Sequence, residues 1–169
     1  MWSTSNFKFA HAELTVQSIT RLIAKLNETS RVAGLPLNSG DCDTSINNTS
    51  TWLSGYPTRN RFHNGQPEYD AYHFSSNQQL KSCDALLWNS TFNTNLPPQT
   101  DAPTIVIGHP NMQFVVAPND FIPVSIRGLD QAGTLFRMDS SVVLPLKKVR
   151  NTDNPSLSEV VNQIESLLT

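Results

Sequence analysis

The stretch that decides the fold is TIVIGHPNMQFVVAPNDFIPVSIRGL, residues 104–129, in which β-branched and aromatic residues form short runs between turn residues. Two further runs of the same kind follow it. Five strands are therefore predicted, at 104–108, 112–117, 121–129, 134–138 and 141–149. Turn signals separate them at intervals of about 8–12 residues, which is typical of a β-sandwich or barrel. The sequence predicts a β-rich region over residues 103–150.

Details of the third run indicate how these strands lie. Its apolar residues alternate with other residues, which predicts one buried and one solvated face; the apolar positions are Ile122, Val124 and Ile126. DQAG, residues 130–133, is typical of a hairpin loop in which Gly133 takes a positive φ. Proline cannot donate to a strand ladder, so Pro123 and Pro145 predict edge strands or bulges.

Both ends of the chain carry the period of an amphipathic helix. The N-terminal helix is expected over about 11–28 and its apolar stripe is Val16, Ile19, Leu22, Ile23 and Leu26. The C-terminal helix is expected over 156–168, with Ser156 and Glu159 as a capping box and an apolar stripe of Leu157, Val160, Val161, Ile164, Leu167 and Leu168. These stripes could pack on each other, on a sheet face or on a protein partner, and pairing with each other is the favoured arrangement.

Between these regions, residues 32–100 form a polar segment without a sustained period and with many turn signals. Short irregular strands are expected there, anchored by Trp52, Tyr72, Phe74 and Trp88. The whole chain, 1–169, is expected to be a single domain of the α+β class. Its core is predicted to be mainly antiparallel and sandwich-like, with an N-terminal and a C-terminal amphipathic helix.

Composition narrows the function classes. Only 15% of the residues are charged and the formal net charge is −2, so the concentrated positive surface that nucleic-acid binding requires is not expected. No apolar run approaches the roughly 20 residues of a membrane span. The first residues, MWSTSNFKFAHAEL, lack the apolar centre of a secretory signal. A chain rich in Asn, Ser, Thr and Pro favours an extracellular or viral surface protein over an intracellular enzyme.

Cys42 and Cys83 lie in similar settings, GDCDT and KSCDA. They could be two unrelated thiols or a disulfide that closes a polar loop, and the disulfide is the prediction. Such a crosslink would stabilise the fold by roughly 3–4 kcal/mol in the chain-entropy model. Two cysteines alone do not make a zinc or redox motif.

Four asparagines occur in the glycosylation acceptor pattern Asn-x-Ser/Thr. They are Asn27, Asn47, Asn48 and Asn89. Together with a disulfide they favour a secreted, glycosylated protein.

RFHNGQPEYDAYHF, residues 61–74, gathers side chains that bind metals or move protons. His63, Asp70 and His73, joined by Glu68 or His109, could form the site of a metal-dependent hydrolase. No ligand spacing of a known metal site is present, however, and a polar loop is the favoured interpretation. We therefore expect no catalytic residue, no metal and no cofactor.

Residues 102–147 resemble the Ig-like or filamin-type β-sandwich repeats of cell-surface proteins. The resemblance rests on VSIRGLDQAGTLFRMDSSVV, residues 124–143, in which a strand, a Leu-Asp-Gln-x-Gly corner, a second strand and an Asp-Ser-Ser turn follow one another. It implies that Asp130 and Gly133 shape the hairpin.

Taken together, these features predict a non-catalytic extracellular or cell-surface domain that supports adhesion, ligand recognition or assembly. A viral capsid or surface protein is the alternative. The metal-dependent hydrolase that uses His63, Asp70 and His73 is the third candidate.

Overall fold

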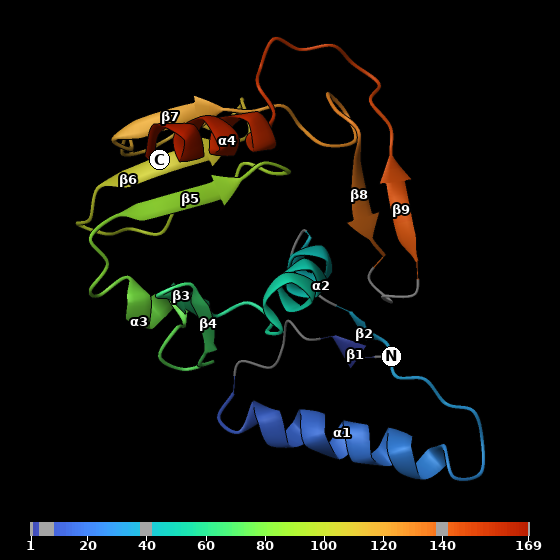
Figure 1. The fold of residues 1–169 in the computed structure, drawn as a ribbon. Helices are drawn as coiled ribbons and strands as arrows, with labels where there is room; N and C mark the ends of the chain where they lie inside the picture. The colour runs from blue at the N-terminus through green and yellow to red at the C-terminus, as the bar shows by residue number, and fades with distance from the viewer. Residues whose placement is uncertain (1, 4–8, 38–41, 138–141, 169) are drawn as a thin grey trace.

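The computed structural model describes residues 2–3, 9–37, 42–137 and 142–168. Within these ranges the chain forms four helices and nine short strands, arranged in several small sheets (Figure 1). In chain order they are β1 (Trp2–Ser3), α1 (Ala12–Leu26), β2 (Pro36–Leu37), α2 (Asp43–Ser54), β3 (Asn60–His63), β4 (Gln66–Tyr69), α3 (Ser76–Gln79), β5 (Leu86–Ser90), β6 (Thr104–Gly108), β7 (Asp120–Pro123), β8 (Gly133–Phe136), β9 (Val143–Leu146) and α4 (Leu157–Leu168). The fold is a mixed α/β domain.

The main sheet is parallel, so the predicted antiparallel sandwich-like core is wrong. Its strand order is β5-β6-β7, and both pairs run in the same direction, with Val106 opposite Trp88 on one side and Phe121 on the other. The central strand β6, TIVIG, is a nearly continuous apolar run, which is the pattern of a strand buried on both faces. The other described strands form three separate two-stranded sheets, and the predicted sandwich character is not confirmed.

The predicted strand at 112–117 is instead part of a crossover. Parallel neighbours require the chain to return along the sheet before the next strand begins, and residues 109–119 make that return between β6 and β7. Met112 is buried, whereas Val115 is 93% and Val116 78% exposed. The β-branched composition of this stretch therefore displays apolar side chains to solvent and does not build a strand.

The C-terminal helix is confirmed, and it packs on the sheet. Val160 of α4 is 5% exposed and forms the core cluster with Ile107 of β6 and Val124 after β7, flanked by Ile122 and Leu157. The capping box is also confirmed, since Ser156 Oγ accepts from the Glu159 amide and the Glu159 carboxylate accepts from the Ser156 amide. The Ser156 backbone amide, and after it a hydrogen bond of the Ser156 side chain, lower the pKa of the Glu159 carboxyl.

The N-terminal helix is confirmed as α1, but it lies at the opposite end of the molecule from α4 (Figure 1). The favoured pairing of the two helices is therefore wrong. The reason is that the sheet offers α4 an apolar face formed by Ile107, Ile122 and Val124.

The predicted hairpin, with DQAG as the loop between the strands at 121–129 and 134–138, is wrong. The strand β7 belongs to the parallel sheet, and β8 instead pairs antiparallel with β9, with Thr134 opposite Pro145. Both prolines predicted at edges are there, because β7 ends the main sheet and β9 belongs to a two-stranded sheet. The predicted Asp-Ser-Ser turn at 139–141 lies outside the described residues. Ser45 Oγ of α2 accepts from the Phe136 amide at 2.9 Å and ties this hairpin to α2.

The corner after β7 is tied together by one buried carboxylate. Asp130, whose side chain is fully buried, accepts from the Ile126 amide at 2.9 Å and from Arg150 Nε at 2.7 Å. Arg150 and the Ile126 amide hold the pKa of Asp130 below its ordinary value. The amides of Val149 and Arg150 also donate to the Leu129 carbonyl. Asp130 therefore holds this corner together, although not as part of the predicted hairpin, and its partner Arg150 was not suggested by the sequence.

The glycine that takes positive φ in this corner is Gly128, at φ 79°, and not Gly133 as predicted. We expect Gly128→Ala to destabilise the domain by about 1–2 kcal/mol, because a side chain in the left-handed region is strained and its Cβ would lie 3.3 Å from Leu146 Cδ1. Gly133→Ala is the matched control, since Gly133 does not take a positive φ and the three atoms nearest its added Cβ all belong to the Arg127 side chain. Urea unfolding of both variants checks this, and equal losses of stability would contradict it.

The middle segment contains more regular structure than predicted, including α2, the β3–β4 hairpin and β5. Trp52 and Tyr72 do not anchor it, because they are 83% and 67% exposed. Trp88 of β5 is half-buried and donates its indole N–H to the Asn95 carbonyl at 2.9 Å. Phe74 is half-buried beneath the Arg61 guanidinium, 5.0 Å from the ring centre.

The predicted disulfide between Cys42 and Cys83 is not formed. Cys42 begins α2 at the N-cap position, whereas Cys83 lies in the turn between α3 and β5. The chain between them folds into separate elements, so it is not a polar loop that needs closing.

Candidate functional site

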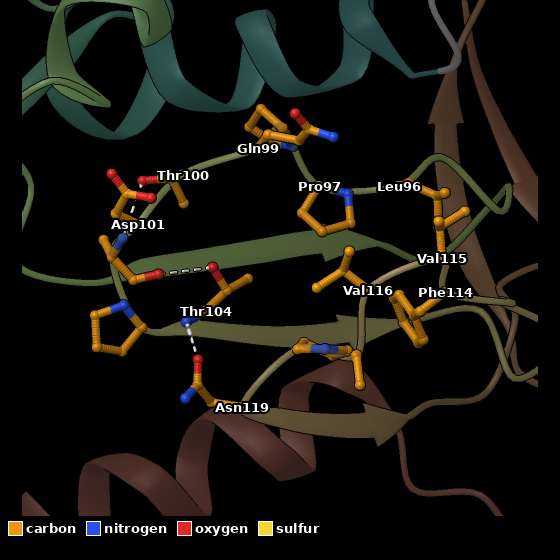
Figure 2. A pocket seen from close by; sticks show the side chains of 15 residues that line it. Leu96, Pro97, Gln99, Thr100, Asp101, Thr104, Phe114, Val115, Val116 and Asn119 are labelled. Carbon is orange, nitrogen blue, oxygen red and sulfur yellow. Dashed lines mark hydrogen bonds between the residues drawn. The ribbon is translucent and has the colours of Figure 1, made fainter.

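The principal cavity of the described structure lies between two crossover segments of the parallel sheet (Figure 2). Its volume is about 760 Å³, and residues 96–104 and 114–119 line it. The first segment leads into β6 and the second leads into β7. The cavity therefore exists because both connections return along the sheet as extended chain without a helix.

Prolines and one asparagine fix the walls of this cavity. Pro97, Pro98, Pro103 and Pro118 restrict the backbone of the two segments. Asn119 joins the two segments to each other. Its side-chain oxygen accepts from the Thr104 backbone amide at 2.8 Å, and its backbone amide donates to the Thr104 carbonyl at 2.9 Å. Phe114 packs edge-to-face on Phe121 of β7, with ring centres 5.0 Å apart.

The side chains that line this cavity suit the binding of a ligand more than catalysis. Its apolar wall consists of Leu96, Phe114, Val115, Val116 and the prolines, and Asp101 is its only ionisable side chain. Thr104 Oγ1 already donates to the Ala102 carbonyl at 3.1 Å. A nucleophile with an adjacent base is not found among these lining residues, so the cavity suits an uncharged, largely apolar group.

A second, polar cavity of about 620 Å³ lies beside the β3–β4 hairpin. Arg61 of β3 and Glu68 of β4 are cross-strand partners and form an ion pair at 2.7 Å. His73 Nδ1 lies 2.8 Å from Asp70 Oδ2, and the amides of Tyr72 and His73 donate to Asp70 Oδ1. The structure thus brings together Glu68, Asp70 and His73 of the predicted set around this cavity.

These hydrogen bonds, first that of the His73 side chain and then the two backbone amides, lower the pKa of Asp70 from 3.8 to about 2. Because the folded pKa is below the unfolded one, any stability from this turn is fully present above pH 3.8 and is lost as the pH falls toward 2. His73 is exposed, so the pair orders an Asx-type turn at the surface.

The other two histidines lie elsewhere. His63 is paired with Gln66 at the turn of the hairpin, whereas Asp70 follows the opposite end, where its amide donates to the Arg59 carbonyl. A strand rises about 3.3 Å per residue, so His63 is roughly 10 Å from the other end of the hairpin. His109 follows β6, and its Nδ1 accepts from the Asn111 amide at 3.1 Å.

We expect His73→Ala to leave the fold intact but to raise the pKa of Asp70 from about 2 toward 3.8, because the largest cause of its lowering is removed. The two amide hydrogen bonds remain, so the pKa should stop short of 3.8. NMR titration of the Asp70 carboxyl measures this. His63→Ala is the control and should leave that pKa unchanged; an equal shift in both variants would place His63 in the cluster.

A protein-built metal centre is not found in the described part of the chain, where no three His, Cys, Asp or Glu side chains are grouped to hold an ion. Among the same residues, no helix combines the length and apolarity of a membrane span.

The predicted glycosylation sites lie in ordinary structural positions. The Asn27 side chain closes the end of α1 by bonding the Ile23 and Val32 backbones, and the Asn47 side chain joins Asp43 to Thr58. Asn48 lies in α2, and Asn89 is exposed on β5.

The principal cavity was not predicted by any pattern in the sequence. Its two walls come from segments that were predicted as polar loop and as strand. The available signal was the four prolines spread over both segments.

Comparison with known proteins provides the functional context. No protein-family model matches the chain. It is 26% identical over 152 residues to one subunit of the tungsten-containing formylmethanofuran dehydrogenase 2 of Methanococcus maripaludis, a match that covers 85% of this chain and 35% of that protein. A solved chain from the formyltransferase/hydrolase complex of Methylorubrum extorquens, in complex with methylofuran, matches with a TM-score of 0.73 and 25% identity.

The structural match covers 92% of this chain and 45% of the solved chain. The chain therefore spans about a third of the length of the curated relative and less than half of the solved one. The metal-ligand side chains of the described residues are not grouped to hold an ion, so they do not fit a tungsten centre built by this chain, and we assign it no tungsten chemistry.

These matches overturn the predicted identity. The resemblance to Ig-like or filamin-type repeats is wrong, because the hairpin motif that carried it is local and the sheet beside it is parallel. The predicted extracellular adhesion function, the cell-surface location and the glycoprotein character are wrong with it. The chain is similar to subunits of a formylmethanofuran dehydrogenase and of a formyltransferase/hydrolase complex, which are not adhesion proteins. The expectation of protein partners fits a structural neighbour that belongs to a multi-protein complex.

Proposed function

We propose that this chain is part of a subunit of a formyl-handling enzyme complex, and that its role there is to build the complex. The observation that carries the proposal is the agreement of two comparisons. A sequence match over 85% of the chain and a structural match over 92% both lead to proteins named for formyl chemistry.

The local chemistry supports a building role over a catalytic one. The histidine at the polar cavity, His73, is paired with Asp70, and this pair caps a surface turn. The larger cavity is mostly apolar and holds one ionisable side chain. The large apolar side chains that the described residues leave exposed, Val115 and Leu167 among them, suit contact with other polypeptides.

A tagged chain purified from the organism that encodes it tests the proposal. We expect it to co-purify in fixed ratio with polypeptides similar to the other subunits of the formyltransferase/hydrolase complex. The purified material should transfer or hydrolyse the formyl group of a formylated furan carrier. Recovery of the chain alone, or with proteins unrelated to formyl chemistry, would contradict the proposal.

The building role is tested separately with variants in the same purification. We expect His73→Ala and His109→Ala to leave assembly unchanged and to keep nearly full activity per complex. A loss of activity of a hundredfold or so with assembly preserved is the size expected for a general acid or base. That result would assign the variant residue to catalysis.

A further inference from the structure

The principal cavity has a polar end and an apolar end. Among the residues that line it, Asp101 and Asn119 lie in the left half of Figure 2, whereas Leu96, Phe114 and Val116 lie in the right half. A molecule that fills the whole cavity therefore needs an apolar body at the Phe114 end and a polar head group at the Asp101 end.

The cavity also has the size and the fixed walls of a small-molecule site. Its volume of about 760 Å³ lies within the range of roughly 300–1,000 Å³ that is usual for such sites. The two hydrogen bonds between Asn119 and Thr104 hold its walls together at the polar end. At the apolar end, Phe114 is held by its edge-to-face contact with Phe121. Walls that are already in place lose little conformational entropy when a ligand binds.

Two polar groups of the lining residues are left for a ligand to bond. The Asn119 side-chain oxygen accepts from the Thr104 amide, but the Asn119 side-chain nitrogen has no partner among the described residues. The Asp101 carboxylate also has no partner within the described ranges. A carboxylate only accepts hydrogen bonds and an amide nitrogen only donates them. The complementary head group therefore has both a donor and an acceptor, as an amide does.

A cationic head group matches these two groups less well. An ammonium would pair with Asp101, but Asp101 is exposed, and an exposed ion pair contributes little in water. An ammonium has no acceptor to offer, so it would also leave the Asn119 side-chain nitrogen without a partner. An uncharged amide satisfies both Asp101 and Asn119.

We propose that the principal cavity binds a small uncharged molecule with an apolar ring at one end and an amide at the other. The ring lies against Phe114 and its apolar neighbours, the amide N–H donates to Asp101, and the amide carbonyl accepts from the Asn119 side chain. This ligand site goes beyond the proposed building role and does not depend on it, because it follows from the cavity's own side chains.

The test is a titration of the purified full chain with N-benzylacetamide, followed by NMR of the backbone amides. We expect saturable shifts at Asp101 and Val116, with a dissociation constant in the millimolar range for so small a ligand. Benzyl acetate is the matched ligand, because it keeps the ring and the carbonyl but lacks the N–H. It should bind about fivefold more weakly, since it cannot donate to Asp101.

Variants of the polar end assign each hydrogen bond. Asp101→Ala should weaken N-benzylacetamide about fivefold and leave benzyl acetate unchanged, so that both ligands bind this variant alike. Asn119→Asp keeps the oxygen that accepts from Thr104 but loses the donor nitrogen, so it should weaken both ligands. Asp153→Ala is the control, because Asp153 is exposed outside the cavity and its loss should change neither affinity.

Thermal unfolding of each variant separates binding from folding. Asp101→Ala removes an exposed side chain, so its melting temperature should equal that of the unchanged chain. The comparison of amide and ester on this variant decides the inference even if Asn119→Asp loosens the walls. The inference is overturned if N-benzylacetamide does not saturate, or if it binds the unchanged chain no better than benzyl acetate. Tighter binding of benzylammonium than of N-benzylacetamide would also overturn it, because the cavity would then be a cation site.

Discussion

Asp130→Ala should lower the melting temperature of this domain by on the order of 10 °C. The carboxylate is fully buried and accepts from two donors in different segments, the Ile126 amide after β7 and Arg150 before α4. Its removal leaves a buried amide without its acceptor and releases the segment that leads into α4. Calorimetry or circular dichroism measures the change.

Asp130→Asn is the control that separates charge from geometry. It retains an acceptor for the Ile126 amide but loses the ion pair to Arg150, so it should cost less than Asp130→Ala. Equal losses would mean that the ion pair alone matters. A melting temperature unchanged in both variants would show that the corner is held by other contacts.

The same carboxylate predicts a pH dependence. Its folded pKa lies below the ordinary value of 3.8, chiefly because of Arg150. The unfolded chain therefore binds the proton more readily, and the stability that Asp130 contributes is present above pH 3.8 and is lost as the pH falls through the folded pKa. Unfolding midpoints measured from neutral to strongly acidic pH should fall less steeply in Asp130→Asn than in the unchanged protein.

Some elements could be predicted because a single local pattern determines them. The stripe and capping box of residues 156–168 predict α4, and the run TIVIG predicts β6. The direction of the strands could not be predicted in the same way. A connection of about ten residues between two strands allows either an antiparallel hairpin or an extended crossover to a parallel strand. Which of the two forms depends on which face of the sheet is covered by α4, a helix distant in the sequence.

The helix α2 shows why composition misled. Its sequence, DTSINNTSTWLS, contains residue types that favour turns. In the structure these side chains bond back to the helix, as Thr51 does to the Asn47 carbonyl, and Asn47 reaches out to Thr58. The hydrogen bond between Asn47 and Thr58 spans 11 residues, so it is a tertiary contact that local helix propensity does not indicate.

The same distinction between local and tertiary contacts applies to the candidate site. Asp70 and His73 are three residues apart, so one turn could bring them together, as it does. The principal cavity instead joins residues near 100 to residues near 116 through Asn119 and Thr104. A contact of that kind follows from the sheet topology, which the sequence pattern left open.

The second large expected effect on stability concerns the packing of α4 on the main sheet. We expect Val160→Asp to abolish cooperative unfolding or to destabilise the domain by more than about 3 kcal/mol. Val160 is 5% exposed between Ile107 and Val124, and no cation lies in that cluster to pair with a carboxylate. Val160→Ala is the milder variant, with an expected loss of about 2 kcal/mol from the lost burial and the resulting cavity.

The matched control is the next residue along the helix. Val161 is 46% exposed, so Val161→Asp introduces the same charge into α4 with water as its neighbour and should cost much less. Comparing the two aspartates in one urea titration separates the burial of a charge from its effect on the helix itself. If both variants are equally destabilised, the helix and not its contact with the sheet is the sensitive feature. If neither is, α4 does not cover β6 and β7 in solution, and the core of this domain lies elsewhere.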